Sequence, residues 1–219
     1  MKPTPYFQIF ECQNPQCRLR FPSNLSIEVF QFCPSCKQEV QPVGKPYTNL
    51  KQLIRHHIHA PYQLKVLLDN LRSTHNVGSI FRTANCAAVN HIYCCGTTPT
   101  PNHSKFSKSS LTADETISWS YDPNSLDIVQ IQKQEGCKIV SVEITENATP
   151  IFSKNLKKVR NSSILLVVGN EISGIDPMIL DESDSIVYIP MLGTKNSLNV
   201  SIAAAIALYS FRFSLVSLD

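Results

Sequence analysis

Residues 185–213 read Ser185-Ile-Val-Tyr-Ile-Pro-Met-Leu-Gly-Thr-Lys-Asn-Ser-Leu-Asn-Val-Ser-Ile-Ala-Ala-Ala-Ile-Ala-Leu-Tyr-Ser-Phe-Arg-Phe213. This pattern predicts a short apolar strand, a break at proline and glycine, a polar loop, and a helix that is apolar on every side. Such a helix must be buried on more than one face. Ser197 or Asn199 can cap it by accepting a hydrogen bond from a free amide of the first turn. A core helix explains the apolar run, but a strand that turns through such a loop can also hold a ligand on exposed backbone groups.

Upstream of this stretch, apolar runs and helical patterns alternate from Leu64 onward and predict an α/β domain. The predicted strands are residues 64–68, 91–95, 137–143 and 164–168. A helix is predicted near residues 123–135. Asn76 is a suitable N-cap for a helix that runs through about Ala88. The packed face of that helix carries Val77, Ile80, Phe81, Ala84 and Ala88. Arg82 lies six residues after Asn76, so both side chains can border one crevice.

The glycine positions exclude two nucleotide-binding motifs. The chain has seven glycines and no G-x-G, so both a Rossmann fingerprint and a P-loop are absent. Instead, Gly169-Asn-Glu-Ile-Ser-Gly174 follows the strand 164–168. Gly169 permits a tight exit from that strand, and Glu171 places a carboxylate where open α/β sheets usually bind ligands.

Length and composition allow one large domain, or one ordinary domain with a small appendage, in 219 residues. With 42% hydrophobic and 17% charged residues, the chain can bury a core. No apolar run is long enough for a membrane span, and the N-terminus lacks the hydrophobic region of a signal peptide. We therefore expect a soluble, cytoplasmic protein with no membrane partner and reduced thiols.

The N-terminal part contains two close pairs of cysteines, Cys12-x4-Cys17 and Cys33-Pro-Ser-Cys36. This spacing matches the requirement of a tetrahedral Zn²⁺ site. A segment of this size, residues 1–45, is too small to be held together by hydrophobic burial alone. The zinc should be structural, because four cysteines leave no open position for a catalytic water. The alternative is scattered core cysteines, which is the interpretation we favour for the other four, Cys86, Cys94, Cys95 and Cys137.

Charge is concentrated at the same end of the chain. Residues 1–60 carry seven Lys/Arg and three Asp/Glu, a balance of +4, whereas the remainder carries thirteen and fourteen, a balance of −1. Four thiolates around one Zn²⁺ would lower the first balance to about +2. A weakly basic end on a neutral body fits a polyanion partner.

Basic and aromatic side chains are interleaved around the cysteines and support two interpretations. Arg18, Arg20 and Lys37, beside Phe21 and Phe32, can grip a nucleic-acid backbone and stack on a base. They can equally form a solvated face over a small aromatic core.

Prolines and a glycine at Pro42, Gly44 and Pro46 predict the start of a linker, which we assign to residues 46–62. The three histidines near its end, His56, His57 and His59, lack paired Cys or carboxylate ligands and are interpreted as surface or phosphate-facing groups rather than metal ligands.

Three blocks together resemble the motifs of a known family. They are Asn76-Val-Gly-Ser-Ile-Phe-Arg82, Gly169-Asn-Glu-Ile-Ser-Gly174, and Ile189-Pro-Met-Leu-Gly193 with Ser197-Leu-Asn-Val-Ser201. In order and spacing they are similar to the SpoU (TrmH) family of the SPOUT superfamily, the S-adenosylmethionine-dependent RNA ribose 2′-O-methyltransferases. The resemblance implies a SPOUT-type α/β knot over residues 63–219, with a deep trefoil knot at the C-terminal end that binds the methyl donor, and a homodimer.

The resemblance also implies roles for single residues. The donor would be held by Thr97, Gly169, Gly174, Ile189, Met191, Ser197 and Leu198. Glu171 and Asn199 resemble the polar pair that organises the site, and Asn76 would position the substrate. Arg82 resembles the catalytic arginine, which acts on the donor pocket of the other subunit. The last helix, apolar on every side, suits such a dimer interface.

The implied reaction is methyl transfer to a ribose 2′-hydroxyl of tRNA or rRNA, which needs no catalytic metal. Arginine is a poor base because its pKa exceeds about 12. Arg82 would therefore bind the adjacent phosphate and stabilise the developing oxyanion. Two alternatives remain at this point: a non-catalytic zinc-ribbon RNA-binding protein, and a SPOUT enzyme that methylates a base.

Overall fold

The computed structural model describes residues 6–27, 29–48, 62–104, 106, 116–153, 156 and 162–213. Contacts within the chain divide it into two compact units, Met1–His57 and Ile58–Asp219. Each unit is described by itself. The three histidines of the predicted linker and most of that linker lie outside the described residues.

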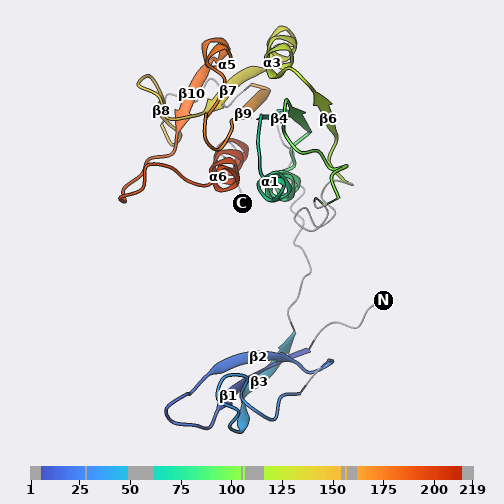
Figure 1. Ribbon diagram of the computed structural model, residues 1–219, viewed down its shortest axis with the longest axis vertical. Coiled ribbons are helices and arrows are strands. Elements are labelled where there is room, and N and C mark those ends of the chain that lie inside the picture. The colour runs from blue at the N-terminus through green and yellow to red at the C-terminus, as the bar shows by residue number, and fades with distance from the viewer. Residues whose placement is uncertain are drawn as a thin grey trace. The chain divides into compact units, whose positions relative to one another are not determined.

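The first unit is a three-stranded antiparallel sheet with the order β2-β1-β3 (Figure 1). Its strands are β1 (Tyr6–Cys12), β2 (Arg20–Asn24) and β3 (Val40–Thr48). Phe10 is buried and stacks on Phe21, whose ring in turn meets Phe30 edge-on, with centroids 5.2 Å apart. This aromatic cluster is small, as expected for a unit of this size.

Strand β3 corrects one interpretation of the sequence. Pro42, Gly44 and Pro46 lie within this strand rather than in a linker. A strand tolerates prolines at the edge of a sheet, where no neighbour requires their missing N–H groups, and β3 is an edge strand. The register shifts between Phe7 and Ile9, and the side chain of Gln8 fills the irregularity by donating to the carbonyl oxygen of Val43 at 2.9 Å.

The second unit is the α/β domain that the alternating pattern predicts. Its sheet has seven strands in the order β6-β5-β4-β9-β7-β10-β8, and every pairing is parallel. The strands are β4 (Leu64–Asp69), β5 (His91–Cys95), β6 (Trp119–Asp122), β7 (Lys138–Val142), β8 (Thr149–Pro150), β9 (Ile164–Val168) and β10 (Ser185–Tyr188). All five residues of β9 are buried, because a central parallel strand is covered on both faces.

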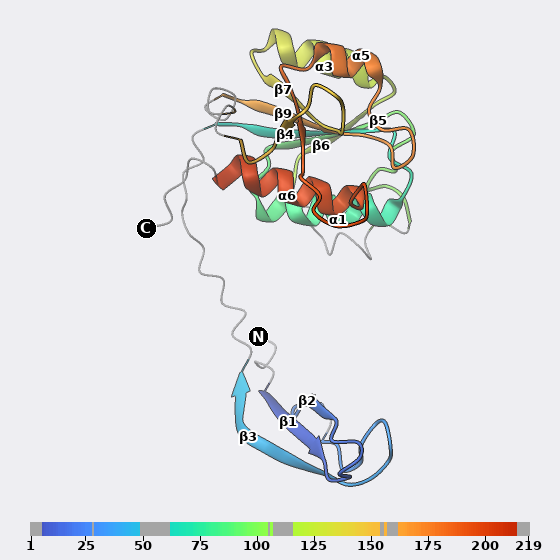
Figure 2. The same ribbon diagram turned by 90° about the vertical axis from the view of Figure 1, so that its left-hand side faces the viewer.

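Helices cover both faces of this sheet, so the unit has three layers. The helices are α1 (Thr74–Cys86), α3 (Ser125–Gln134), α5 (Pro177–Glu182) and α6 (Val200–Phe213). Helices α1 and α6 lie together on one face, and α3 and α5 lie on the other (Figure 2). None of the helices in the described part of the chain is long and apolar enough to cross a membrane.

The start and end of α1 differ from the prediction. Ser73, not Asn76, is the N-cap, and its hydroxyl accepts a hydrogen bond from the backbone N–H of Asn76 at 3.3 Å. The side chain of Asn76 is buried and engaged elsewhere. At the other end, Ala88 is exposed with φ +52° beyond the helix, and Ala87 takes the expected place in the core. The other four positions of the predicted face are buried: Val77, Ile80, Phe81 and Ala84.

A buried arginine fastens α6 to the end of α1. Arg212 is only 2% exposed and donates to the carbonyl oxygens of Ala87 (2.8 Å), Ala88 (2.7 Å) and Tyr62 (3.1 Å). Its guanidinium also lies 5.5 Å from the centre of the Tyr62 ring, whose hydroxyl donates to the carbonyl oxygen of Phe211. Arg212 therefore satisfies carbonyl groups that the end of α1 leaves without helical partners.

Candidate active site and metal centre

One cavity of the second unit opens at the carboxyl ends of the parallel strands, where α/β sheets usually bind ligands. Its volume is about 370 Å³. The residues that line it are Val142, Glu143, Ile144, Val168, Gly169, Asn170, Glu171, Ile172, Gly174, Tyr188, Ile189, Met191, Ser197, Leu198, Asn199, Val200 and Ala203. They come from the ends of β7, β9 and β10 and from the first turn of α6. We call this cavity the strand-end pocket.

A closed turn after β9 forms one wall of the strand-end pocket. The backbone groups of Asn170 and Gly174 exchange two hydrogen bonds of 3.0 Å. A Cβ atom on Gly169 would lie 2.5 Å from the backbone of Gly174, so only glycine fits there. Gly174 has φ +74°, and a Cβ atom on it would meet a carboxylate oxygen of Glu143 at 2.6 Å. The close approach of backbone atoms therefore requires glycine at position 169, whereas the left-handed backbone conformation favours glycine at position 174.

Three polar side chains form a network beside that turn. One carboxylate oxygen of Glu171 accepts hydrogen bonds from the side-chain amide of Asn76 at 2.8 Å and from the backbone N–H of Ser73 at 3.1 Å. The other oxygen accepts from the backbone N–H of Arg72 at 2.9 Å. Asn199 then donates from its side-chain amide to the Asn76 oxygen at 3.1 Å. The network therefore ties the start of α1, the turn after β9 and the start of α6 together.

The charge state of Glu171 follows from these contacts. Partial burial favours the protonated form, but the hydrogen bonds donated by Arg72, Asn76 and Ser73 outweigh it and hold the pKa of Glu171 below its ordinary value. At neutral pH the network is therefore centred on a carboxylate. Asn199 also caps α6, since its side-chain oxygen accepts from the backbone N–H of Ser201 at 2.9 Å, which confirms one of the two predicted caps.

A second cavity adjoins the first across this network. Its volume is about 450 Å³, and its lining residues are Arg72, Ser73, Asn76, Glu171 and Asn199. We call it the polar hollow. Glu171 and Asn199 line both cavities, so they lie on the shared wall. The arrangement can hold one ligand in each cavity with their reacting groups facing each other at this wall.

The structure brings most of the expected site residues to these two cavities. The strand-end pocket includes Gly169, Gly174, Ile189, Met191, Ser197, Leu198, Glu171 and Asn199, and the polar hollow includes Asn76. Thr97 is not in this group: it is exposed, and its backbone N–H donates to the side chain of Asn70 at 3.1 Å. Arg82 is also outside it, as an exposed side chain on α1 that lines neither cavity.

Two charged residues of the cavities do not appear among the residues expected from the sequence. Glu143 lines the strand-end pocket, and one of its carboxylate oxygens accepts from the backbone N–H of Ile175 at 3.2 Å. Arg72 lines the polar hollow with an exposed guanidinium. The signal for both was their position at the end of a predicted strand or just before a predicted helix.

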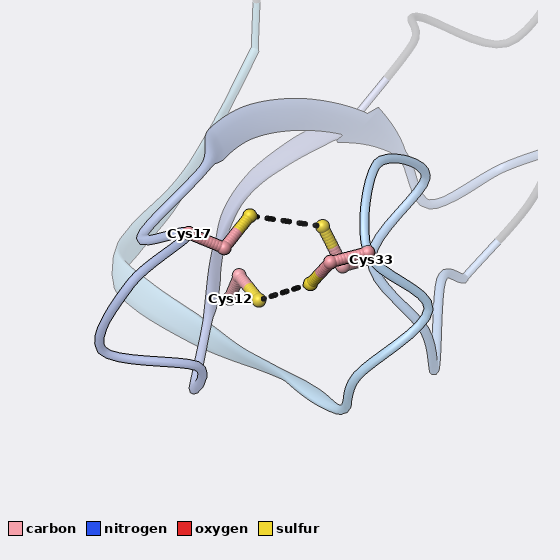
Figure 3. Close-up of side chains that lie close together, drawn as sticks. Cys12, Cys17 and Cys33 are labelled. Atoms are coloured by element: carbon pink, nitrogen blue, oxygen red, sulfur yellow. Dashed lines mark hydrogen bonds between the residues drawn. The ribbon is translucent and has the colours of Figure 1, made fainter.

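The four N-terminal cysteines form a single cluster in the first unit (Figure 3). Their sulfur atoms all lie within 4.8 Å of one another, with Cys12 and Cys36 at 3.4 Å and Cys17 and Cys33 at 3.8 Å. A tetrahedron of Zn–S bonds of roughly 2.3 Å places sulfur atoms roughly 3.8 Å apart. All four are free thiols rather than disulfides. The donor set and its size therefore fit one Zn²⁺.

Backbone amides favour the thiolate form on one side of the cluster. The backbone N–H of Gln38 lowers the pKa of the Cys36 thiol to about 7, and that of Cys36 lowers the pKa of Cys33. Burial instead raises the pKa of Cys12 to about 12. Four thiolates at these distances repel one another, so a divalent cation is needed to hold all four deprotonated.

Comparisons with known proteins agree with the geometry of the second unit. The sequence model of the SpoU rRNA Methylase family matches residues 63–209. A putative TrmH family tRNA/rRNA methyltransferase from Staphylococcus aureus (strain COL) is 31% identical over 144 residues, which are 66% of this chain and 56% of that protein. The chain thus spans little more than half the length of the curated relatives it matches.

Solved structures show the same fold. The crystal structure of an AdoMet-bound rRNA methyltransferase from Sinorhizobium meliloti superposes with a TM-score of 0.65 and 26% identity, covering 71% of this chain and 57% of that one. The A. aeolicus TrmH/SpoU tRNA modifying enzyme superposes with a TM-score of 0.59 and 26% identity, covering 68% of this chain and 74% of that one. Each of the two structures matches a larger part of this chain than the first unit contains. Both matches therefore include the α/β unit.

Proposed function

The chain belongs to the SpoU rRNA Methylase family, and on this premise we propose that it transfers a methyl group from S-adenosylmethionine to a ribose 2′-hydroxyl of tRNA or rRNA. The observation that carries the proposal is the pair of adjoining cavities with Glu171 and Asn199 on their shared wall. One cavity suits the methyl donor, and the other suits the nucleotide that accepts the methyl group.

The strand-end pocket fits the donor by its chemistry. Its charged side chains are two carboxylates, Glu143 and Glu171, and its walls expose backbone groups of the turn Gly169–Gly174. S-adenosylmethionine carries a net positive charge, a ribose diol and an adenine edge, which carboxylates and backbone groups recognise. When bound, it supplies a methyl group activated by a sulfonium. We expect Ile189, Met191 and Leu198 to provide the apolar contacts.

The residues of this chain then have to activate a weak nucleophile. The ribose 2′-oxygen forms a bond to the methyl carbon as the S–C bond breaks, the bonding electrons return to sulfur, and the hydroxyl proton leaves to the adjacent phosphate. Asn76, held by Glu171 and Asn199, would orient the nucleotide in the polar hollow. Arg82 would bind that phosphate and stabilise the developing negative charge on oxygen.

A homodimer would bring Arg82 to the site. Within one chain this arginine lines neither cavity, so in our proposal it acts on the cavities of a partner copy. Helix α6 supports this part of the proposal, because Ile202 and Tyr209 are exposed on a helix that is apolar on every side. Exposed apolar side chains of this size favour burial against a second copy. The trefoil knot around the donor, the cytoplasmic location and the structural Zn²⁺ stay predictions of the same proposal.

Two measurements test the reaction. Calorimetry with S-adenosylhomocysteine should show binding to the wild-type chain and a much weaker signal for a variant that fills the turn, Gly169→Val. Ribose-methylation mapping of total RNA from cells with and without the protein should show a 2′-O-methyl mark that depends on it. Donor binding together with a mark on a base would identify a base methyltransferase, and donor binding with no mark would refute methyl transfer.

Mixing two inactive variants tests the shared site. Homodimers of Arg82→Ala and of Asn199→Ala should each be inactive, whereas co-expressed chains should form heterodimers with one intact site. Recovery of roughly a quarter of the wild-type activity is expected, since about half of the dimers are mixed and each has one working site of two. If mass measurement shows mixed dimers but no activity is recovered, Arg82 does not act in the partner's site.

A further inference from the structure

The first unit has a concave surface of its own that the proposed chemistry does not use. It is an open hollow of about 690 Å³, lined by Gln13, Asn14, Pro15, Phe32, Lys37, Gln38 and Glu39. Its two sides flank the two cysteine pairs and are joined by a hydrogen bond from the backbone N–H of Gln13 to the carbonyl oxygen of Glu39 at 3.0 Å. Its volume lies within the range of roughly 300–1,000 Å³ that is typical of small-molecule sites. We call it the ribbon hollow.

Phe32 supplies a flat apolar surface in this hollow. Its side chain is 54% exposed, although it is a large aromatic group next to the cluster. The other phenylalanine considered from the sequence, Phe21, is instead half-buried and stacks on Phe10. Arg20, another candidate, lies 3.5 Å from Glu11 and is partly neutralised. Of the basic and aromatic residues considered from the sequence, Phe32 and Lys37 are therefore the two that line the hollow.

The polar groups of the hollow have mixed character. Lys37 offers a cation, Glu39 a carboxylate, and Gln13 and Gln38 each offer an amide donor and an amide acceptor. A site for phosphate alone would not include Glu39, because its charge repels an anion. A nucleobase edge presents both donors and acceptors, and its faces stack on aromatic rings. The hollow therefore matches a nucleotide. Its aromatic ring can stack on the face of the base, its two amides and its carboxylate can bond the edge, and its cation can pair with the phosphate.

The backbone is strained at two basic residues beside the cysteine pairs, and one of them, Lys37, lines the hollow. The residue that follows the second cysteine of each pair has a left-handed conformation: Arg18 has φ +49° and Lys37 has φ +62°. Glycine would adopt it without strain, whereas other residues lose on the order of 1 kcal/mol. Both positions nevertheless carry a cation, on a segment whose formal charge is positive.

We propose that the ribbon hollow binds one unpaired nucleotide of RNA, with the base stacked on Phe32, its edge bonded to Gln13, Gln38 and Glu39, and its phosphate paired with Lys37. The choice of RNA as ligand rests on the proposed function. The hollow would hold a single-stranded part of the substrate while the second unit carries out methyl transfer. It therefore adds affinity and selection of the substrate rather than chemistry.

Tryptophan fluorescence tests the stacking directly in the full zinc-loaded chain. The chain has one tryptophan, so Phe32→Trp adds one reporter in the hollow, and Ile27→Trp adds one at a site 82% exposed that does not line it. Titration with a single-stranded RNA of about eight nucleotides should quench the Phe32→Trp reporter and leave the Ile27→Trp reporter unchanged. Equal responses of the two reporters would overturn the proposal.

The affinity of the variants for RNA is the second test of the ribbon hollow. Phe32→Ala should weaken binding of the same RNA about tenfold, the scale of losing one stacked base, while Phe32→Tyr and Ile27→Ala stay within about twofold. Zinc content, measured on every variant, confirms that the unit is folded. A duplex of the same length should bind more weakly than the single strand. Unchanged affinity for Phe32→Ala, or equal affinity for the duplex, would refute a base-stacking site.

The outcomes keep this inference apart from the proposed function. If the chain methylates RNA but Phe32→Ala changes neither RNA affinity nor KM, the hollow has no role and the methyltransferase proposal stands. If no RNA is methylated but single-stranded RNA still binds through Phe32, the hollow is an RNA site on a protein of other activity.

Discussion

The two units of this chain are stabilised in different ways. Among its described residues, the first unit buries only three side chains classed as hydrophobic, Phe10, Cys12 and Cys33, and two of these are candidate zinc ligands. The second unit buries continuous apolar clusters on both faces of a parallel sheet. A metal ion can replace a hydrophobic core in a small unit, whereas the larger unit needs none. The comparison also separates the two candidate sites: among the described residues the cysteine cluster lies in the first unit, and both cavities of the proposed reaction lie in the second.

Removal of zinc should have the largest effect and should affect one unit only. In Cys33→Ser, or after chelation, we expect the first unit to unfold completely, because metal-binding energy of roughly 10–16 kcal/mol is folding energy in such modules. The second unit should keep its melting transition and its affinity for S-adenosylhomocysteine.

Calorimetric scanning and elemental analysis check this prediction. Cys86→Ser, which changes an exposed cysteine outside the cluster, is the matched control and should retain one zinc per chain. Loss of the second unit's transition in Cys33→Ser would contradict the independence of the two units.

Arg82→Ala should leave the stability of both units unchanged and affect only the reaction. We expect the rate of methyl transfer to fall by about a hundredfold or more, the scale of losing one preorganised donor to a developing charge. Arg82→Lys should restore little, because a point charge does not reproduce a two-pronged contact. Single-turnover kinetics at saturating RNA measure the rate constant. An unchanged constant with weaker RNA binding would reduce Arg82 to a phosphate contact.

Arg212→Met should destabilise the second unit alone. The substitution keeps the apolar stem but leaves the carbonyl oxygens of Tyr62, Ala87 and Ala88 without their buried donor. We expect the free energy of unfolding to fall by roughly 2–4 kcal/mol. Urea denaturation measures it, with the exposed Arg82→Met as the control at less than about 0.5 kcal/mol. A change in the first unit's zinc content would show that the units are coupled.

The sequence predicted the parts of the fold that local pattern determines. Strands β5 and β9 have the predicted bounds, and for β9 the reason is that a parallel strand buried on both faces is a short continuous run of apolar residues. The cap of α6 and the cysteine cluster were also predicted, since each has a short local signal: a polar residue before an apolar helix, and two closely spaced pairs of cysteines.

What the sequence did not predict depends on contacts between distant segments. Pro42 and Pro46 suggested a linker, and only the sheet order shows that β3 is an edge strand that tolerates them. Asn76 has the chemistry of an N-cap, but Glu171, 95 residues later, engages its side chain, and Ser73 caps the helix instead. Glu143 and Arg212 gain their roles in the same way, from neighbours that folding alone brings close.

The smallest effect we expect is the pH dependence of the network at Glu171. Its pKa is lower in the folded chain than the ordinary value of 4.5, so ionised Glu171 stabilises the second unit above about pH 4.5, and this contribution is lost as pH falls through the lower folded pKa. Glu171→Gln should therefore reduce the free energy of unfolding at neutral pH, by on the order of 1 kcal/mol after allowance for solvent screening of this exposed group.

The deficit of Glu171→Gln should shrink as the pH is lowered below about 4.5, because the wild-type carboxyl becomes neutral as well. Urea denaturation of the second unit near pH 7 and near pH 3.5 measures both values. Glu146→Gln, which changes an exposed carboxylate that lines neither cavity, is the matched control. Zinc binding by the cysteine cluster also depends on pH, so the stability of the first unit changes over the same range. Unfolding is therefore followed in the second unit alone, by the fluorescence of Trp119 on β6. A deficit that stays constant across this range would mean that Glu171 acts through its shape and hydrogen bonds, and not through its charge.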